Sequence, residues 1–139
     1  MQTQIELKGD EVLIAAFRHA PEIVAQELKP MSDAALLLLV SDLKRYPAAL
    51  PDSSYVRTLT LGRTWAAANP EWRTVARGFE GSIGNSTPYG PYVQGAGFQA
   101  EVHAGRWTTD EEAVDVNYDA IKGYFELGAQ KIAARLGGD

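Results

Sequence analysis

The sequence predicts a single α+β domain, in which a long, kinked N-terminal helix and a C-terminal amphipathic helix pack on a small antiparallel β-sheet. Apolar residues recur at helical spacing between Val12 and Arg45. Short β-like runs bounded by turn residues occupy positions 58–84, and a second helical stripe occupies positions 109–136. The chain has 139 residues and is 45% hydrophobic, which suits one domain spanning 1–139 with one core.

The N-terminal part is predicted to be an edge strand followed by a helix with a kink. Residues 2–8 alternate weakly between polar and apolar and fit a strand at a sheet edge. Pro21 favours a helix start, and Pro30 should kink or break the helix near Glu27. Ser32 or Asp33 could then cap a further helical run that ends before Tyr46-Pro47.

The middle of the chain is predicted to hold a meander of two to four antiparallel strands. The β-like pieces are Thr58 to Ala67, Trp72 to Phe79 and Gly81 to Gly84, with turns at Asn69-Pro70 and at Gly78 to Gly81. Irregular, loop-rich segments are expected at about 46–60 and 85–107. Within the second of these, the segment 88–93 is too rich in proline for a central strand.

The C-terminal helix has the clearest signals. Thr108 or Thr109 can cap it, acids fill the first turn at 110–112, and Lys131 and Arg135 lie near its end, an arrangement that complements the helix dipole. Its expected buried stripe is Val114, Tyr118, Ile121, Phe125, Gly128 or Ala129, Ile132 and Leu136.

Composition excludes several functional classes. There are no cysteines, and two histidines, His19 and His103, are too few for a histidine-rich metal site, so we expect no metal and no cofactor. The net charge of −5 and the pI near 5.0 argue against tight nucleic-acid binding. The N-terminus lacks the features of a signal peptide, and the longest apolar stretch, 34–40, is too short for a membrane span.

No motif in the sequence indicates a catalytic activity. Gly78-x-x-Gly81-x-x-Gly84 lacks the Lys-Ser/Thr of a phosphate-binding loop and fits turn glycines better. Glu101-x-His103 would place an acid and an imidazole on one face of a strand, where they could orient a base or share a metal, but no third ligand or nucleophile accompanies them. We therefore expect a protein that is not an enzyme.

Aromatic residues concentrate in the irregular middle of the chain. Seven of the 13 aromatic residues lie between Trp65 and Trp107, and the bases between positions 55 and 107 are all arginine. Tyr, Trp and Arg are the residues enriched at the centres of protein–protein interfaces. This composition favours assembly over catalysis.

Two stretches carry a resemblance to a known family. The stretch 55–65 (YVRTLTLGRTW) is similar to the "R-T-G-x-L-x-x-S" segment of phage minor tail components, and 81–95 (GSIGNSTPYGPYVQG) resembles their "G-x-V-G-x-x-x-x-Y-A-x-Y-V-E-x-G" signature. The family is the lambdoid-type tail-completion, or head–tail joining, proteins. Gln94 stands where that family often has glutamate, so no intersubunit salt bridge is expected from it.

The resemblance implies a homo-oligomeric ring at the virion neck, assembled in the host cytoplasm, which joins the head-closure or connector protein to the tail terminator or tail tube. DNA would only pass through its lumen. The residues that would contact neighbouring subunits are Arg57, Arg63, Trp65, Tyr89, Tyr92, Val93, Gln94 and Trp107. Two alternatives stay open: a tail terminator or head-closure protein, and a small α+β enzyme or ligand-binding domain with a pocket lined by tryptophan.

Overall fold

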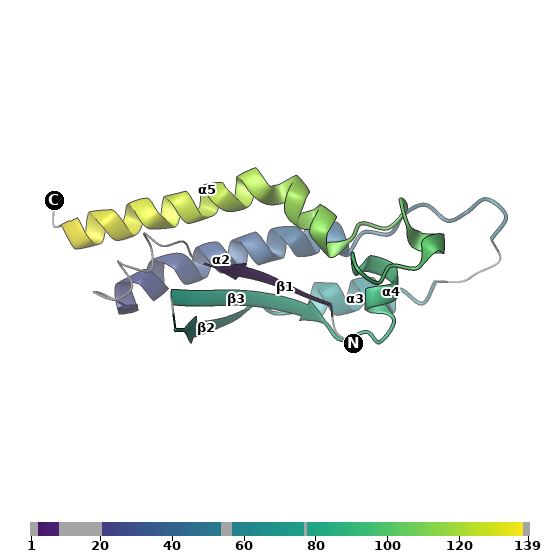
Figure 1. Cartoon of the computed structure of the whole chain (residues 1–139), viewed down its shortest axis with the longest axis horizontal. Coiled ribbons are helices and arrows are strands. Elements are labelled where there is room, and N and C mark those ends of the chain that lie inside the picture. The colour runs from purple at the N-terminus through teal and green to yellow at the C-terminus, as the bar shows by residue number, and fades with distance from the viewer. Residues whose placement is uncertain (1–2, 9–20, 54–56, 77, 138–139) are drawn as a thin grey trace.

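The structure is a computed structural model that describes residues 3–8, 21–53, 57–76 and 78–137. Two long helices and a three-stranded antiparallel sheet confirm the α+β class (Figure 1). In chain order the elements are β1 (Thr3–Lys8), α2 (Pro21–Leu43), α3 (Thr60–Ala67), β2 (Glu71–Val75), β3 (Gly78–Asn85), α4 (Gly90–Gln94), the 3-10 turn η1 (Glu101–His103) and α5 (Asp110–Gly137).

The sheet has β3 at its centre, in the order β1-β3-β2. β2 and β3 form an antiparallel hairpin, and β1 pairs with the other edge of β3, with Ile5 opposite Ile83. β1 therefore confirms the edge strand predicted for residues 2–8. Nearly every residue of β3 is buried, as expected for a central strand that a helix covers.

α2 is continuous through Pro30, so the predicted break is wrong, and Ser32 lies inside the helix instead of capping a new one. Pro30 is exposed, whereas Leu28 and Ser32 on either side of it are fully buried. The packing of that buried face holds one helix across the proline, which overrides the local cost of a missing N–H. The helical spacing noted between positions 12 and 20 lies outside the described residues.

α5 runs antiparallel to α2 and lies along it (Figure 1). Its first turn is a capping box: the backbone N–H of Glu112 donates to Thr109 Oγ1 at 3.2 Å, and the N–H of Thr109 donates to Glu112 Oε2 at 3.0 Å. The prediction of a cap at Thr108 or Thr109 is thereby confirmed at Thr109. The expected buried stripe is wrong at Tyr118 and Leu136, which are both exposed.

The segment 60–67, predicted to be a strand, is the helix α3. Residues 58–61 alternate as a strand would, but Leu61 and Trp65 are spaced four apart and are both buried on one helical face. The predicted turn at Gly78 to Gly81 is also wrong, because these residues begin β3. Likewise, Glu101 and His103 lie in a 3-10 turn and do not share a strand face.

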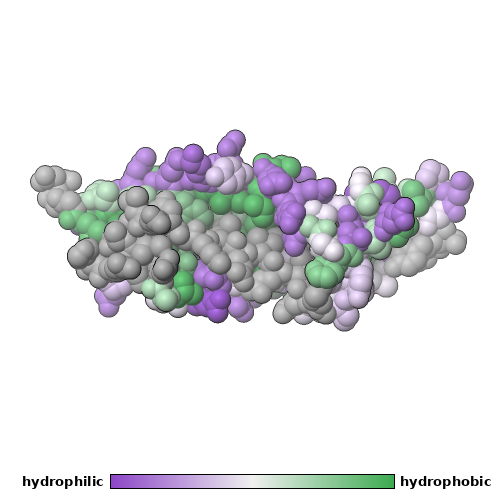
Figure 2. Space-filling model, in the orientation of Figure 1, coloured by the Kyte–Doolittle hydropathy of each residue, from purple (hydrophilic) through white to green (hydrophobic). Residues whose placement is uncertain are grey.

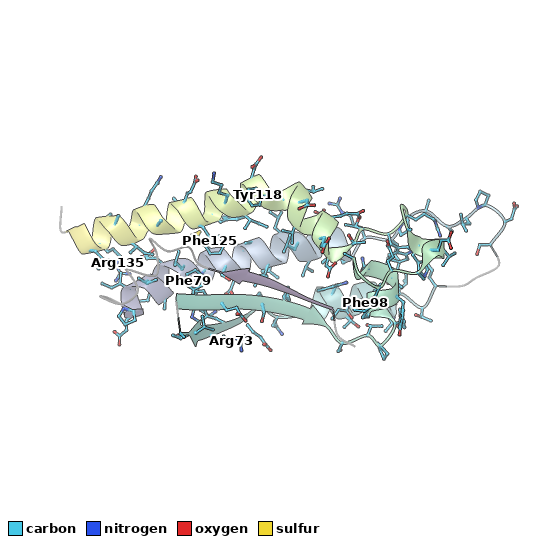
Figure 3. The ribbon with its side chains drawn as sticks, in the orientation of Figure 1. Arg73, Phe79, Phe98, Tyr118, Phe125 and Arg135 are labelled. Carbon is cyan, nitrogen blue, oxygen red and sulfur yellow. The ribbon has the colours of Figure 1, made fainter. Side chains whose placement is uncertain are left out.

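The core consists of two clusters between the helices and the sheet. The larger one joins α2, α3, β3, α4 and α5 around Trp65 and Ile83. The smaller one includes Phe79, whose ring stacks on Phe125 of α5 at 6.0 Å and on Trp72 of β2 at 4.6 Å. Figure 3 shows Phe79 and Phe125 in the space between the sheet and α5. The segments around α4 and η1 lie at one end of the molecule, beyond the sheet (Figure 1).

Candidate functional site

A cleft of about 470 Å³ lies at the end of the molecule that carries α4 and η1. The described residues that line it come from positions 46–53 and 57–61, from positions 89–93 in and before α4, and from positions 102–107 in and after η1. The predicted irregular segments thus come together in one place, although they are far apart in the sequence. Proline punctuates the first of these segments, at Pro47 and Pro51, and both proline and glycine punctuate the second, which favours turns and short helices.

Arg57 is one of the lining residues of the cleft, and it contacts two aromatic rings of the same lining. Its guanidinium lies 5.5 Å from the ring centroid of Tyr46 and 5.6 Å from that of Trp107, and the two rings meet edge-to-face at 5.0 Å. Arg57 Nη1 also donates to the carbonyl of Pro47 at 2.5 Å. These contacts hold a partly exposed cation beside a pair of touching aromatic rings, which stabilise its charge.

A second cationic group, Arg106, lies on the opposite stretch. Its Nη2 donates to the carbonyl of Ala48 at 3.2 Å, which ties residues 102–107 to the 46–53 segment. Beside it, burial and then the positive charge of Arg106 lower the pKa of His103 below its ordinary value of 6.5. At neutral pH the imidazole is therefore uncharged, and the positive charge of the cleft comes from the two arginines.

The rim of the cleft exposes large apolar side chains. Five of them are Leu50 (51% exposed), Leu59 (43%), Tyr89 (43%), Tyr92 (61%) and Val102 (63%). Figure 2 shows hydrophobic residues interspersed with hydrophilic ones at this end of the molecule. Exposed apolar side chains that cluster in this way mark surfaces that contact other molecules.

Leu59 also has a backbone conformation that leucine rarely adopts. Its φ is 63°, in the left-handed region, and it precedes the first residue of α3 without a side-chain cap. A left-handed non-glycine residue costs about 1–2 kcal/mol. Such strain persists where the surrounding structure imposes it, and it clusters at functional surfaces.

The structure separates the residues predicted to contact other subunits. Tyr89 and Tyr92 are exposed, Arg57 and Trp107 are half-buried, and all four line the cleft together with the buried Val93. The others lie elsewhere. Arg63 is exposed on α3, beside a separate shallow hollow that Gly84 and Ser86 also line.

Trp65 and Gln94 are placed in the interior of the chain, with 0% and 1% of their surface exposed. Neither can contact another subunit in this fold, so their predicted interface role is replaced by a supporting one: Trp65 Nε1 donates to Gln94 Oε1 at 2.9 Å. Sequence reasoning missed Tyr46, Leu59 and Arg106 as cleft residues. Only the proximity of Arg106 to Trp107 in the sequence could have signalled one of them.

The side chains of the cleft are suited to recognition by charge and by aromatic contact. The lining residues that the structure describes include two arginines, a neutral histidine and several aromatic rings, and none of them is a carboxylate. Among the described residues, no three His, Asp or Glu side chains gather as metal ligands would. No helix among the residues that the structure describes is long and apolar enough to cross a bilayer. Comparison with protein-family models, with curated proteins and with solved structures gives no match to this chain.

Proposed function

We propose that this chain is a non-enzymatic structural subunit of a bacteriophage neck or tail, and that it forms a homo-oligomeric ring joining the head connector to the tail tube. The observation that carries the proposal is the group of exposed apolar side chains around the cleft. A monomeric protein gains nothing from leaving Tyr92 and Val102 more than half exposed in one place. A subunit that contacts neighbours would bury them on assembly.

The two stretches that resemble tail-completion proteins support the same reading. They are distant in sequence, yet two buried hydrogen bonds join them: Trp65 Nε1 to Gln94 Oε1, and Asn85 Nδ2 to the carbonyl of Leu61 at 3.1 Å. Trp65, Asn85 and Gln94 of these stretches therefore form a buried, hydrogen-bonded frame. That frame presents α4, and with it Tyr92, at the surface.

Tail terminators and head-closure proteins are neighbouring roles in the same class. The net charge of −5 suits any of them, because a ring through which DNA passes should not bind phosphate tightly. A second candidate function of another class is a small-ligand-binding domain. The observation favouring it is the cleft itself, since 470 Å³ falls within the range of small-molecule sites.

Deletion of the gene in the phage or prophage that encodes it tests the proposal. We expect DNA-filled heads and separate tails by electron microscopy, and recovery of joined particles when the purified chain is added to the deletion lysate. The chain should also be found in purified virions in several copies per particle. Normal yields of infectious particles from the deletion would refute the proposal, and binding of a small metabolite with unchanged assembly would favour the second candidate.

A further inference from the structure

The outer face of α5 carries an apolar stripe that nothing within the described chain covers. Val116 is 78% exposed and Leu127 is 44% exposed, the two largest apolar side chains of the stripe. The exposed Ala120 and Gly123 lie between them, at spacings of four, three and four residues. These four residues, called here the outer stripe, lie on the side of α5 opposite to the buried Ile121 and Ile132.

Gly123 in the outer stripe has no close packing partner among the described residues. A Cβ added at Gly123 would meet no atom within 4 Å, whereas one at Gly128, on the buried side, would lie 2.7 Å from Cδ2 of Leu28. Gly128 is thus explained by the close contact of α5 with α2. Gly123 weakens the helix without any such benefit in the isolated chain, and a contact with a second molecule would supply one.

Acidic residues border the outer stripe. Asp115 and Asp119 are both exposed, one turn apart, beside Val116 and Ala120. The cleft has the opposite character, because Arg57 and Arg106 line it and no carboxylate does, in a chain whose net charge is −5. The nearest acids in the sequence, Asp52 and Glu101, are not among its lining residues.

We propose that the outer stripe of α5 in one copy docks against the cleft of the next copy. This inference rests on the proposed function, and it names the two surfaces that meet between neighbouring subunits. Val116 and Leu127 would cover Tyr92 and the other exposed apolar residues of the rim, while Asp115 and Asp119 would face Arg57 and Arg106. A guanidinium has five N–H donors. Each arginine can therefore keep its hydrogen bond to a backbone carbonyl and still donate to a carboxylate of the next copy.

The two surfaces lie on different parts of the subunit, so the contact is head-to-tail. The cleft is at the end that holds α4, and the outer stripe runs along the middle of α5 (Figure 1). Each copy then has one donor and one acceptor surface, and repetition produces a closed ring or an open helix, depending on the angle. A two-fold dimer in which the two copies exchange these surfaces would use both contacts within the pair and could not extend to larger species.

Cysteine cross-linking tests the contact directly, because the natural chain has no cysteine. The variant Tyr92→Cys/Val116→Cys, at millimolar concentration under mild oxidation, should give a ladder of covalent dimers, trimers and larger species. Each single variant should give none, and an equimolar mixture of the two should stop at dimers. The matched control is Ala66→Cys/Val116→Cys, which moves one thiol to the exposed Ala66 of α3; it should not form a ladder.

Adding Asp115→Lys and Asp119→Lys to the double-cysteine chain should abolish the ladder, whereas Glu71→Lys, an exposed acid on β2, should leave it intact. Efficient cross-linking of either single variant with itself, or of the control pair, would overturn the inference. So would a chain that stays monomeric, or a Tyr92→Cys chain that cross-links in virions to a different protein. These outcomes are separable from failure of the proposed function, which the gene deletion decides alone.

Discussion

Trp65 and Gln94 form a buried hydrogen bond between two elements 29 residues apart, with 2.9 Å from the indole Nε1 to Oε1. The amide Nε2 of Gln94 donates in turn to the carbonyl of Leu43 at 2.7 Å, at the end of α2. One glutamine side chain therefore links α2, α3 and α4. Leu61 of α3 and Tyr92 and Val93 of α4 line the cleft, so its shape depends on this pair although neither Trp65 nor Gln94 lines it.

Replacing Gln94 by alanine should destabilise the protein strongly. The change leaves the Trp65 N–H and the Leu43 carbonyl buried without a partner, and each such group costs about 1–3 kcal/mol. We expect the free energy of unfolding, measured with urea, to fall by about 3 kcal/mol. Gln130→Ala, an exposed substitution on α5, should change it by less than about 0.5 kcal/mol. Equal effects of the two variants would contradict the structure.

The two glycines of α5 should respond to alanine in opposite directions. Gly123→Ala should raise the free energy of unfolding of the monomer by up to about 1 kcal/mol, through helix propensity alone. Gly128→Ala should lower it by about 1–3 kcal/mol, because the new methyl group meets Leu28, which is fully buried and has no room to move. Thermal and urea unfolding of both variants check the sign. A stabilising Gly128→Ala would mean that α2 and α5 are not in close contact there.

Substitution of Leu59 should reveal its backbone strain. Glycine adopts a φ of 63° without the steric cost that a leucine or an alanine bears. Leu59→Gly should therefore be more stable than Leu59→Ala by about 1 kcal/mol, although both variants lose the same side chain from the rim. Chemical unfolding of the pair measures the difference. If alanine were the more stable of the two, residue 59 would not be left-handed.

His103 should make stability depend on pH below neutrality. Its pKa is lowered in the folded state by burial and by Arg106, so the unfolded chain binds a proton more readily. Stability is then full above the unfolded value of 6.5 and falls as the pH drops below it. His103→Gln should remove this part of the pH dependence. Urea unfolding between pH 5 and pH 7.5 tests it, as does an NMR titration of the imidazole, which should show a midpoint below 6.5.

Truncation of Tyr92 should impair assembly without affecting folding. Its ring is 61% exposed at the cleft rim, so Tyr92→Ala removes contact area that only a partner would bury. We expect a soluble, folded variant with at least about a tenfold loss in association, as for a central interface aromatic, measured as head–tail joining in the deletion lysate. Phe98→Ala is the matched control, because Phe98 is 57% exposed but does not line the cleft. A larger defect from Phe98→Ala would place the interface elsewhere.

Trp65→Ala belongs to a different class of variant. The side chain is completely buried in the larger core cluster. Truncation of a buried tryptophan costs about 3–5 kcal/mol. Loss of joining by that variant would therefore report on folding and not on a subunit contact, and circular dichroism should show the loss of structure directly.

Elements with strong local signals could be predicted from the sequence. The C-terminal helix was recognisable because its cap, its acids and its apolar stripe agree, and Thr109 and Glu112 do form the cap. α3 could not be recognised, because Thr58 to Leu61 alternate as in a strand, and only the burial of Leu61 with Trp65 selects a helix. Tertiary packing overrode the local preference there, as it did at Pro30.

The candidate site was predictable as a region but not residue by residue. Aromatic and arginine enrichment pointed to segments that form one cleft, which Arg57, Tyr92 and Trp107 line. Composition cannot distinguish a tryptophan that fills the core from one that lies at the surface. For Trp65 the difference arises from Gln94, a partner too distant in sequence to be paired by any local pattern.

The strand order has a consequence for how the chain acquires its structure during synthesis. β1 is made well before its partner β3, with Thr3 paired to Asn85, and α2 must likewise wait for α5, which follows β3 in the chain. The nascent chain can complete its sheet only after β3 has left the ribosome, and its helix pair only after α5 has followed. Until then the apolar faces of β3 and α2 stay uncovered, and this is the interval in which aggregation competes with folding.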